Sequence, residues 1–375
     1  MQAFTIVAEP QSCHSGCSLR HRVLSCLCQQ KFFIDNENEI HSVQAWLLPE
    51  IGTIDSLRLD TIATQLPGED EVTLDVLYAA LNPADRYLAE GLYPARPSFP
   101  HVLGRDAVGV VSRIGNGVGD WKLGDKALLL RGEAGVSQLG TLAQQVTVRA
   151  ECLERVPADW TDQQAACAAL VYVTAYQALT QFESPSNNVV LISGASGGVG
   201  VATTQLARAM GHTVIGLSRS HEKATKLLGL GATWTLNPED PLWPKTLKQL
   251  LPSRRVDLIV DNIGGALLPK MIDTLGMNGC VSLVGMLGGP VPQFNTASLF
   301  FRRLRMRGVA VSTYSLEENR MAWRQVVAML GEINQRPVID SIFPMQQVPA
   351  AFARLAEGPM GKVLVDVAAT LLRSE

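Results

Sequence analysis

The segment with the clearest chemical potential is a glycine-rich turn that separates a short apolar run, 189–192, from a helical pattern. The turn contains Gly194, Gly197, Gly198 and Gly200. The unbroken β-branched run predicts a strand buried on both faces. Glycine allows close backbone approach to a phosphate, and a helix N-terminus presents N–H groups and a positive dipole end to it. Strand, glycine turn and helix together predict a dinucleotide-binding unit, against the alternative of a glycine-rich turn that binds nothing.

The end of the next predicted strand, 213–217, distinguishes the two nicotinamide cofactors. The residues that follow are Ser218 and Arg219, with Lys223 one helical turn later. An NAD-binding unit carries Asp or Glu there, and a carboxylate would repel a 2′-phosphate. A guanidinium and hydroxyls can hold that phosphate. NADPH is therefore the predicted cofactor; the alternative is that these cations are solvated surface charges.

Further strand and loop pairs extend the predicted sheet. Strands expected at 256–261 and 280–284 are each followed by a glycine-containing loop. Loops after the carboxyl ends of parallel strands line the ligand crevice of an open α/β sheet. The cofactor-binding residues predicted from these turns are Gly194, Ala195, Ser196, Gly197, Gly198, Val199, Gly200, Ser218, Arg219, Lys223, Asn262, Gly285 and Met286.

Composition narrows the class of protein. A length of 375 residues suggests two domains, and 47% hydrophobic with 18% charged residues is typical of a chain with a sizeable core. The net charge of −3 provides no general attraction for nucleic acid or anionic membrane. The longest apolar stretch, 165–179, is too short and too polar to span a bilayer. Seven cysteines without a disulfide framework favour a reduced, cytoplasmic protein.

The first part of the chain, 1–41, is expected to be a poorly ordered or peripheral extension. Its cysteines and histidines have irregular spacings and form no CxxC pair, so no metal site is predicted there. It also lacks the long apolar core of a secretory signal.

A β-rich domain is expected next, and it is followed by a helical segment. Alternating apolar residues predict strands at 72–78, 107–114, 126–130 and 144–148. A capping box at Thr161 predicts a helix that runs to about Phe182.

Towards the C-terminus a last sheet strand is expected at 311–313 and a helix at 316–335, and the β-rich tail 338–367 is expected to return to the first domain. The basic run 300–307 is interpreted as a solvated helix face, the alternative being contact with the phosphates of a coenzyme A thioester.

Several motifs in this order resemble the zinc-free quinone oxidoreductase branch of the medium-chain dehydrogenase/reductase superfamily. They are NPADRYLAEGLYP, GRDAVGVVSRIGNGV, GDKALLL, VYVTAYQAL, GASGGVG, VDNIGG and GKVLVDV, within about 43–368. The resemblance implies a Rossmann doubly wound parallel sheet, 165–337, and a β-rich GroES-like catalytic domain built from 42–164 and 338–375. It also implies an active site between the two domains and a homodimer.

The resemblance also bears on zinc. Zinc-dependent relatives carry Gly-His-Glu where this chain has Gly104, Arg105 and Asp106, and their cysteine ligands fall near Asn82 and Leu170. Cys167 lies three positions before the second of these. A catalytic zinc site needs three protein ligands. The chain is therefore expected to bind no metal and to reduce an acceptor that is already polarised, a quinone or an enone.

The resemblance suggests the residues beside the substrate. Tyr93 is the candidate proton donor, Tyr87 a second choice, Asn82 a nicotinamide-side amide and Thr174 a cofactor contact. Each has a structural alternative: aromatic packing for the tyrosines, turn capping for Asn82 and core packing for Thr174. One departure from the family is Pro238, which stands where relatives often carry a tyrosine near the 2′-phosphate.

The expected activity is NADPH-dependent reduction of a quinone or enone. The alternatives are a 2-enoyl-thioester reductase and a non-catalytic NADPH-binding protein.

Overall fold

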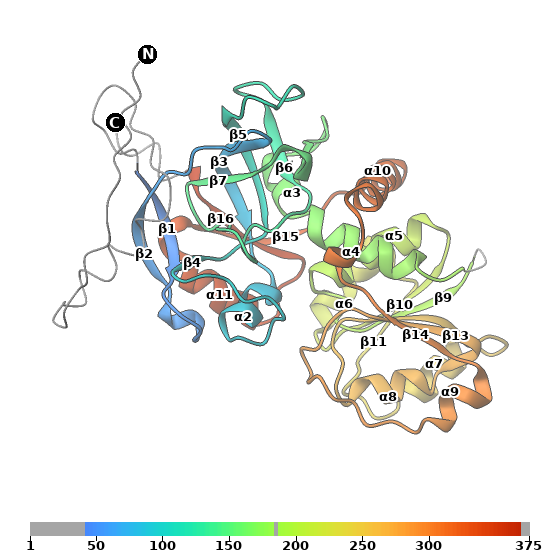
Figure 1. The fold of residues 1–375 in the computed structure, drawn as a ribbon. Helices are drawn as coiled ribbons and strands as arrows, with labels where there is room; N and C mark the ends of the chain where they lie inside the picture. The colour runs from blue at the N-terminus through green and yellow to red at the C-terminus, as the bar shows by residue number, and fades with distance from the viewer. Residues whose placement is uncertain (1–41, 184–186, 369–375) are drawn as a thin grey trace, which may run out of the picture. The chain divides into compact units, whose positions relative to one another are not determined.

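The computed structural model describes residues 42–183 and 187–368. The predicted extension 1–41, with its cysteines and histidines, lies outside the described residues, as do 184–186 and 369–375. The described chain is built around two larger sheets (Figure 1).

One of them is a parallel sheet that follows the doubly wound order. Its first strand along the chain is β9 (Val189–Ile192). The second and third strands lie on one side of β9 and the later ones on the other, so the order reverses between β9 and β12 (Val256–Asp261). The predicted fold class is confirmed. In spatial order the strands are β11 (Trp234–Leu236), β10 (Thr213–Leu217), β9 (Val189–Ile192), β12 (Val256–Asp261), β13 (Leu275–Leu283) and β14 (Arg305–Gly308).

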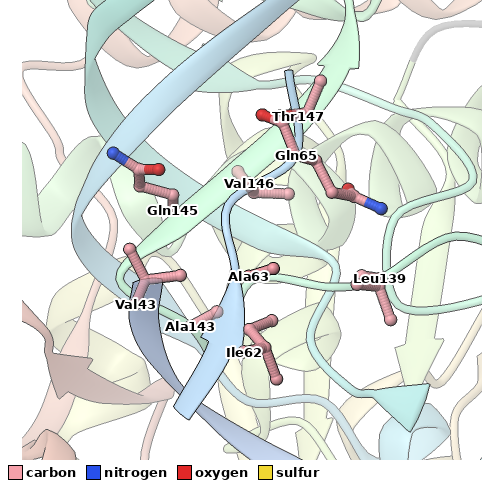
Figure 2. A pocket seen from close by; sticks show the side chains of 9 residues that line it. All are labelled: Val43, Ile62, Ala63, Gln65, Leu139, Ala143, Gln145, Val146 and Thr147. Atoms are coloured by element: carbon pink, nitrogen blue, oxygen red, sulfur yellow. Dashed lines mark hydrogen bonds between the residues drawn. The ribbon is translucent and has the colours of Figure 1, made fainter. Parts of the chain in front are cut away.

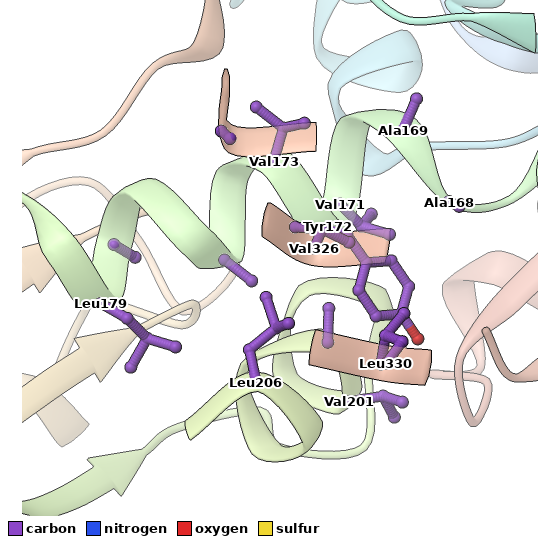
Figure 3. Packing of buried hydrophobic residues seen from close by; sticks show 14 of the residues in the cluster. Ala168, Ala169, Val171, Tyr172, Val173, Leu179, Val201, Leu206, Val326 and Leu330 are labelled. Carbon is purple, nitrogen blue, oxygen red and sulfur yellow. The ribbon is translucent and has the colours of Figure 1, made fainter. Parts of the chain in front are cut away.

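Helices cover both faces of this sheet because its strands are apolar on both sides. Val190 and Ile192 of β9 belong to the cluster built with α4, α5 and α10, whereas Val189 and Leu191 belong to the cluster built with α7 and α8. Figure 3 shows side chains of α4, α5 and α10 meeting around Tyr172. The helices of this part are α4 (Ala169–Thr180), α5 (Gly198–Ala209), α6 (His221–Leu230), α7 (Trp243–Leu250), α8 (Leu267–Ile272), α9 (Ala297–Arg302) and α10 (Leu316–Glu332).

The other large sheet is mostly antiparallel and lies in the β-rich part. Its strands in spatial order are β15 (Ile339–Pro344), β16 (Lys362–Asp366), β3 (Glu71–Ala80), β5 (Asp106–Ile114), β6 (Lys126–Leu129) and β8 (Leu153–Arg155), with β7 (Gln145–Arg149) also paired to β3. A smaller sheet consists of β2 (Arg58–Ala63), β1 (Ser42–Leu48) and β4 (His101–Val102). The helices here are α2 (Pro83–Ala89), α3 (Asp162–Ala166) and α11 (Val348–Ala356).

The C-terminal tail returns to the antiparallel sheet of the β-rich part, as predicted. Strand β16 pairs antiparallel with β3, with Leu364 opposite Ala80. Strand β15 pairs parallel with β16, and α11 forms the crossover between them. Segments nearly 300 residues apart in the chain are therefore adjacent in one sheet.

The predicted helix from Thr161 to Phe182 is wrong as a single element. Helix α3 ends at Ala166 and α4 begins at Ala169, with Cys167 between them in a non-helical conformation. The break has a packing reason: α3 contacts β3 and β5 of the antiparallel sheet, whereas α4 contacts α5 and α10. One straight helix could not make both sets of contacts.

The predicted strand 311–313 is also wrong. These residues form a 3₁₀ turn, and the last strand of the parallel sheet is the earlier segment β14. The basic run is therefore part helix, α9, and part edge strand, joined at Arg303 in a left-handed conformation. Met306 faces the apolar cluster, and the arginines of β14 lie on an exposed edge, where charge is tolerated.

Two further features complete the fold. No helix within 42–183 and 187–368 is long and apolar enough to cross a membrane. A small cavity of about 10 Å³ lies beside β7 and has room for at most one water molecule. Figure 2 shows the side chains that line it. The domain boundaries placed at 164/165 and 337/338 stay a prediction.

Candidate functional site

The glycine turn, residues 194–200, forms a tight backbone cradle at the carboxyl end of β9. Gly194 has a φ of +54°. A Cβ on Gly200 would lie 2.2 Å from the carbonyl oxygen of Gly194, so only glycine fits there. The first intrahelical bond of α5 is donated by Val201 to Gly197, which leaves the N–H groups of Gly198 and Val199 at the open end of the helix. This geometry suits an anion such as a diphosphate.

The loops after β12 and β13 pack onto this cradle. Asn262 donates from Nδ2 to the carbonyl of Ser193 at 2.8 Å. The N–H of Gly285 donates to the carbonyl of Asp261 at 3.2 Å, and a Cβ on Gly285 would lie 2.3 Å from the carbonyl oxygen of Asn262. The structure thus brings Asn262 and Gly285, with Met286 next to it, to the edge of the sheet where β9 ends.

The predicted adenosine-side residues lie together after β10, but their cations already have partners. Ser218 is buried and donates from Oγ to the carbonyl of Ser220 at 3.2 Å. Arg219 is exposed and forms an ion pair with Glu239 at 3.6 Å. The ammonium of Lys223 donates to the carbonyl of Gly358. Glu239 was not found from the sequence, because its loop follows β11 and only the fold places it beside Arg219.

Asn82, which the resemblance places on the nicotinamide side, immediately precedes α2 and is buried. Its backbone N–H donates to the carboxylate of Asp85 at 2.8 Å. Its side-chain amide is engaged at both ends: Nδ2 donates to Oδ2 of Asp106 at 2.9 Å, and Oδ1 accepts from Nζ of Lys362 at 2.6 Å. The amide orientation is therefore set by two charged neighbours.

Tyr93 lies next to the same network. The guanidinium of Arg105 stands 4.3 Å from the centre of the Tyr93 ring and pairs with the buried carboxylate of Asp85 at 3.1 Å. Burial raises the pKa of Asp85, and the neighbouring Arg105 opposes that rise. Tyr93 is half-buried and packs against the apolar cluster of the β-rich part.

Tyr87 and Thr174 have different surroundings. The carbonyl of Tyr87 accepts from the N–H of Tyr93 at 3.1 Å, and burial raises the pKa of the Tyr87 phenol. Thr174 lies on α4 and donates from Oγ1 to the carbonyl of Leu170 at 2.6 Å, so its hydroxyl can only accept from a ligand.

Sequence reasoning assigned no role to Asp106 or Lys362, yet the structure centres the polar network on them. Asp106 accepts from Leu170 N at 3.2 Å, from Asn82 and from Nζ of Lys362 at 3.0 Å. The signal available in the sequence was the one lysine within the apolar run of β16. We call Asp106, Asn82, Lys362 and the N–H of Leu170 the Asp106 cluster.

The positions that the resemblance equates with zinc ligands do converge. Asn82 and Leu170 both bond to Asp106, and Arg105 precedes it. Cys167 is fully buried and donates from Sγ to the carbonyl of Gln164 at 3.4 Å. Burial raises the pKa of Cys167 to about 12, so it remains a thiol. Across residues 42–183 and 187–368, no group of three His, Cys, Asp or Glu side chains is placed to hold a metal ion.

Comparison with known proteins agrees with this architecture. Residues 68–158 match the model of the alcohol dehydrogenase GroES-like domain, and residues 198–332 match that of a zinc-binding dehydrogenase. The chain is 28% identical to quinone oxidoreductase of Lama guanicoe, over 86% of this chain and 97% of the relative. It is 30% identical to the synaptic vesicle membrane protein VAT-1 homolog of Rattus norvegicus, over 85% of this chain and 83% of that protein.

The fold is also that of a solved structure, Escherichia coli quinone oxidoreductase complexed with NADPH. The TM-score is 0.78 at 24% identity, covering 87% of this chain and 100% of the other. A doubly wound sheet together with a GroES-like part defines the general class, a dehydrogenase fold. The chain belongs to the quinone oxidoreductase branch of the medium-chain dehydrogenase/reductase superfamily, a superfamily of oxidoreductases.

We expect Gly200→Ala to damage the glycine turn. The added methyl would meet the backbone of Gly194 and Ala195, which cannot move without displacing β9. The free energy of unfolding should fall by about 1–3 kcal/mol in urea titrations. Gly229→Ala on α6 is the matched control, since nothing lies within 4 Å of its new methyl. That control should be neutral or slightly stabilising. An equal change in the free energy of unfolding for the two variants would contradict the close packing at Gly200.

Alkaline pH should destabilise the protein through Cys167. Its pKa is about 12 when folded against an ordinary 9.0, so the unfolded chain loses this proton first. The contribution of the Cys167 thiol to the free energy of unfolding is complete below pH 9. It decreases by about 1.4 kcal/mol per pH unit between the two pKa values. Urea unfolding of wild type and Cys167→Ala at about pH 8, 9 and 10 should show the steeper decline only in wild type. Parallel declines would mean that the thiol ionises normally.

Proposed function

We propose that this protein is an NADPH-dependent oxidoreductase that transfers hydride, without a catalytic zinc ion, to a quinone or an activated C=C acceptor such as an enone. The observation that carries the proposal is the site at the carboxyl end of β9 and β10. A glycine cradle opens onto the N-terminus of α5, and the neighbouring strand ends in Ser218 and Arg219 rather than in a carboxylate.

The cofactor would be held at two charged points. The N–H groups of Gly198 and Val199 would receive the diphosphate, and Ser218, Arg219 and Lys223 would receive the 2′-phosphate. A phosphate dianion would compete with Glu239 for Arg219, and it would win because the exposed Arg219–Glu239 pair is weak. The related E. coli quinone oxidoreductase was solved with NADPH.

The proposed zinc-free chemistry depends on the side chains at the former ligand positions. Asn82, Arg105 and Leu170 are poor ligands, and the thiol of Cys167 keeps its proton. The nicotinamide supplies the hydride when it is bound. The protein's own task is then to orient the acceptor and to stabilise the negative charge that develops on its oxygen.

Tyr93 is the proposed proton donor to that oxygen. Its phenol is a donor at neutral pH, and the Arg105 guanidinium over its ring restricts the ring's orientation. Tyr87 is the second candidate. The amide of Asn82 is already engaged by Asp106 and Lys362, so we assign it an orienting role rather than proton transfer.

We further propose a homodimer in the cytoplasm, with no nucleic acid or membrane partner. Strand β14 is the last strand of the parallel sheet among the described residues. Phe300 and Phe301 precede it, are 63% and 73% exposed, and have ring centres 4.4 Å apart. An edge strand beside exposed aromatic rings suits pairing with a second copy.

Arg219→Ala should separate the two cofactors. Affinity for NADPH should fall about tenfold, or about 1.4 kcal/mol, because the guanidinium–phosphate contact is lost, while affinity for NADH stays the same. Titration calorimetry with both cofactors measures the effect. Arg324→Ala is the control, since Arg324 is also exposed and forms an ion pair with Glu317. Equal losses for both cofactors would refute the 2′-phosphate site.

Tyr93→Phe tests the donor and the acceptor class together. We expect kcat/KM for an enone to fall about tenfold through loss of the phenol proton, and Tyr87→Phe to change it by less than about twofold. Assays of NADPH oxidation with quinones, enones and unsaturated thioesters provide the comparison. A loss confined to thioesters would favour an enoyl-thioester reductase. Absence of turnover with every acceptor would favour a non-catalytic NADPH-binding protein.

A further inference from the structure

Lys362 is the most unusual side chain of the site. It lies on β16 with its side chain 5% exposed, and its ammonium reaches Oδ1 of Asn82 at 2.6 Å and Oδ2 of Asp106 at 3.0 Å. Asp106 itself is 1% exposed. Both charges of this ion pair are therefore removed from water.

Stability alone does not explain such a pair. Desolvation of two charges offsets most of their attraction, and apolar replacements of buried ion pairs are often neutral or stabilising. Strand β16 is otherwise apolar at this point, with Val363, Leu364 and Val365 fully buried. A methionine would complete that run at lower desolvation cost. The charge at this position therefore indicates a role in the site.

The strand that carries Lys362 also contacts the glycine turn. The N–H of Gly361 donates to the carbonyl of Ser196 at 2.9 Å, and Gly361 forms a parallel bridge with Gly197. A Cβ on Gly198 would lie 3.0 Å from Cδ of Lys362. The aliphatic part of the Lys362 side chain thus covers Gly198, the first residue of α5. Its ammonium bonds to Asn82, the residue before α2.

The Asp106 cluster extends this connection to two more elements. Asp106 accepts from the N–H of Leu170 at the start of α4, and Leu170 accepts from the hydroxyl of Thr174. On the other side, Asn82 is bonded to Asp85, which pairs with the Arg105 that lies over Tyr93. One buried cation therefore connects the cofactor-binding turn with the residues proposed to face the acceptor.

We propose that Lys362 is a positioning residue for hydride transfer. Its ammonium, held by Asp106, sets the amide of Asn82 and the start of α2 relative to the glycine turn, so that the nicotinamide and the acceptor meet in one geometry. The proposal rests on the proposed function for its kinetic test. Misplacement of reacting atoms by about 1 Å is enough to lower a rate about 100-fold without loss of binding.

The test separates charge from packing with Lys362→Met, Asp106→Asn and the double variant, in full-length protein. Lys362→Met alone leaves an unpaired buried carboxylate and should lower the midpoint of thermal unfolding by roughly 10 °C. The double variant removes both charges and should recover most of that loss. The exposed pair Lys126 and Asp162, 2.8 Å apart, provides the matched control as Lys126→Met with Asp162→Asn.

Two measurements on the double variant decide the question. Titration calorimetry should give NADPH affinity within about threefold of wild type, while the fluorescence gain of the bound reduced nicotinamide is lost because its ring is no longer fixed. With a quinone, kcat should fall about 10- to 100-fold, with KM for NADPH nearly unchanged and a larger isotope effect from NADPH deuterated at C4. Lys362→Arg, which keeps the charge, should recover part of kcat.

Recovery of both fluorescence and kcat in the double variant would overturn the proposal, because the pair would then serve stability only. Failure of the double variant to fold would overturn it as well, for the same reason. Wild type without turnover on any acceptor would defeat the proposed function, and the fluorescence comparison would still decide the role of Lys362.

Discussion

The contact on which the site depends is the docking of Gly361 against the glycine turn. It joins a strand of the antiparallel sheet to the loop after β9 of the parallel sheet, through the bond from Gly361 to Ser196 and the bridge to Gly197. Gly361 has a φ of +83°, and a Cβ there would lie 2.2 Å from the carbonyl oxygen of Val338. Glycine is therefore required at position 361, where the left-handed backbone and the nearby carbonyl of Val338 leave no room for a side chain.

The charges of the site follow from this junction. Lys362 comes directly after Gly361, so the docking carries its ammonium into the interior, where it pairs with the carboxylate of Asp106. Asp106 also accepts a hydrogen bond from the N–H of Leu170. The bonds to Asp106 and Lys362 fix the orientation of the Asn82 amide. Asp85 and Arg105 form a second pair beside the first. The network is satisfied internally, which lets it hold several elements in one arrangement.

Family membership and function rest on different observations in this protein. The sequence relatives define the superfamily branch and the two sheets define the fold, but this fold supports several chemistries, so the acceptor has to be argued from the site. The residues that favour NADPH and a polarised acceptor are Arg219 near Glu239, the thiol of Cys167 and the phenol of Tyr93 under Arg105.

Local sequence was sufficient where the physics is local. The run 189–192, the glycines of the turn and Ser218 with Arg219 predicted the parallel sheet, its cradle and the end of β10, because strand burial and glycine conformation depend on neighbours in the chain. The residues at the site were named, and their cofactor and substrate roles stay predictions.

Tertiary structure decided what depends on distant partners. The break at Cys167 arises because the two halves of the predicted helix contact different elements, and β14 becomes a strand because the edge of the sheet accepts its arginines. Glu239 meets Arg219, and Lys362 meets Asp106 from 256 positions away, only once the chain is folded. Pairwise charge contacts between remote segments leave no periodic pattern in a single sequence, so only the fold could reveal them.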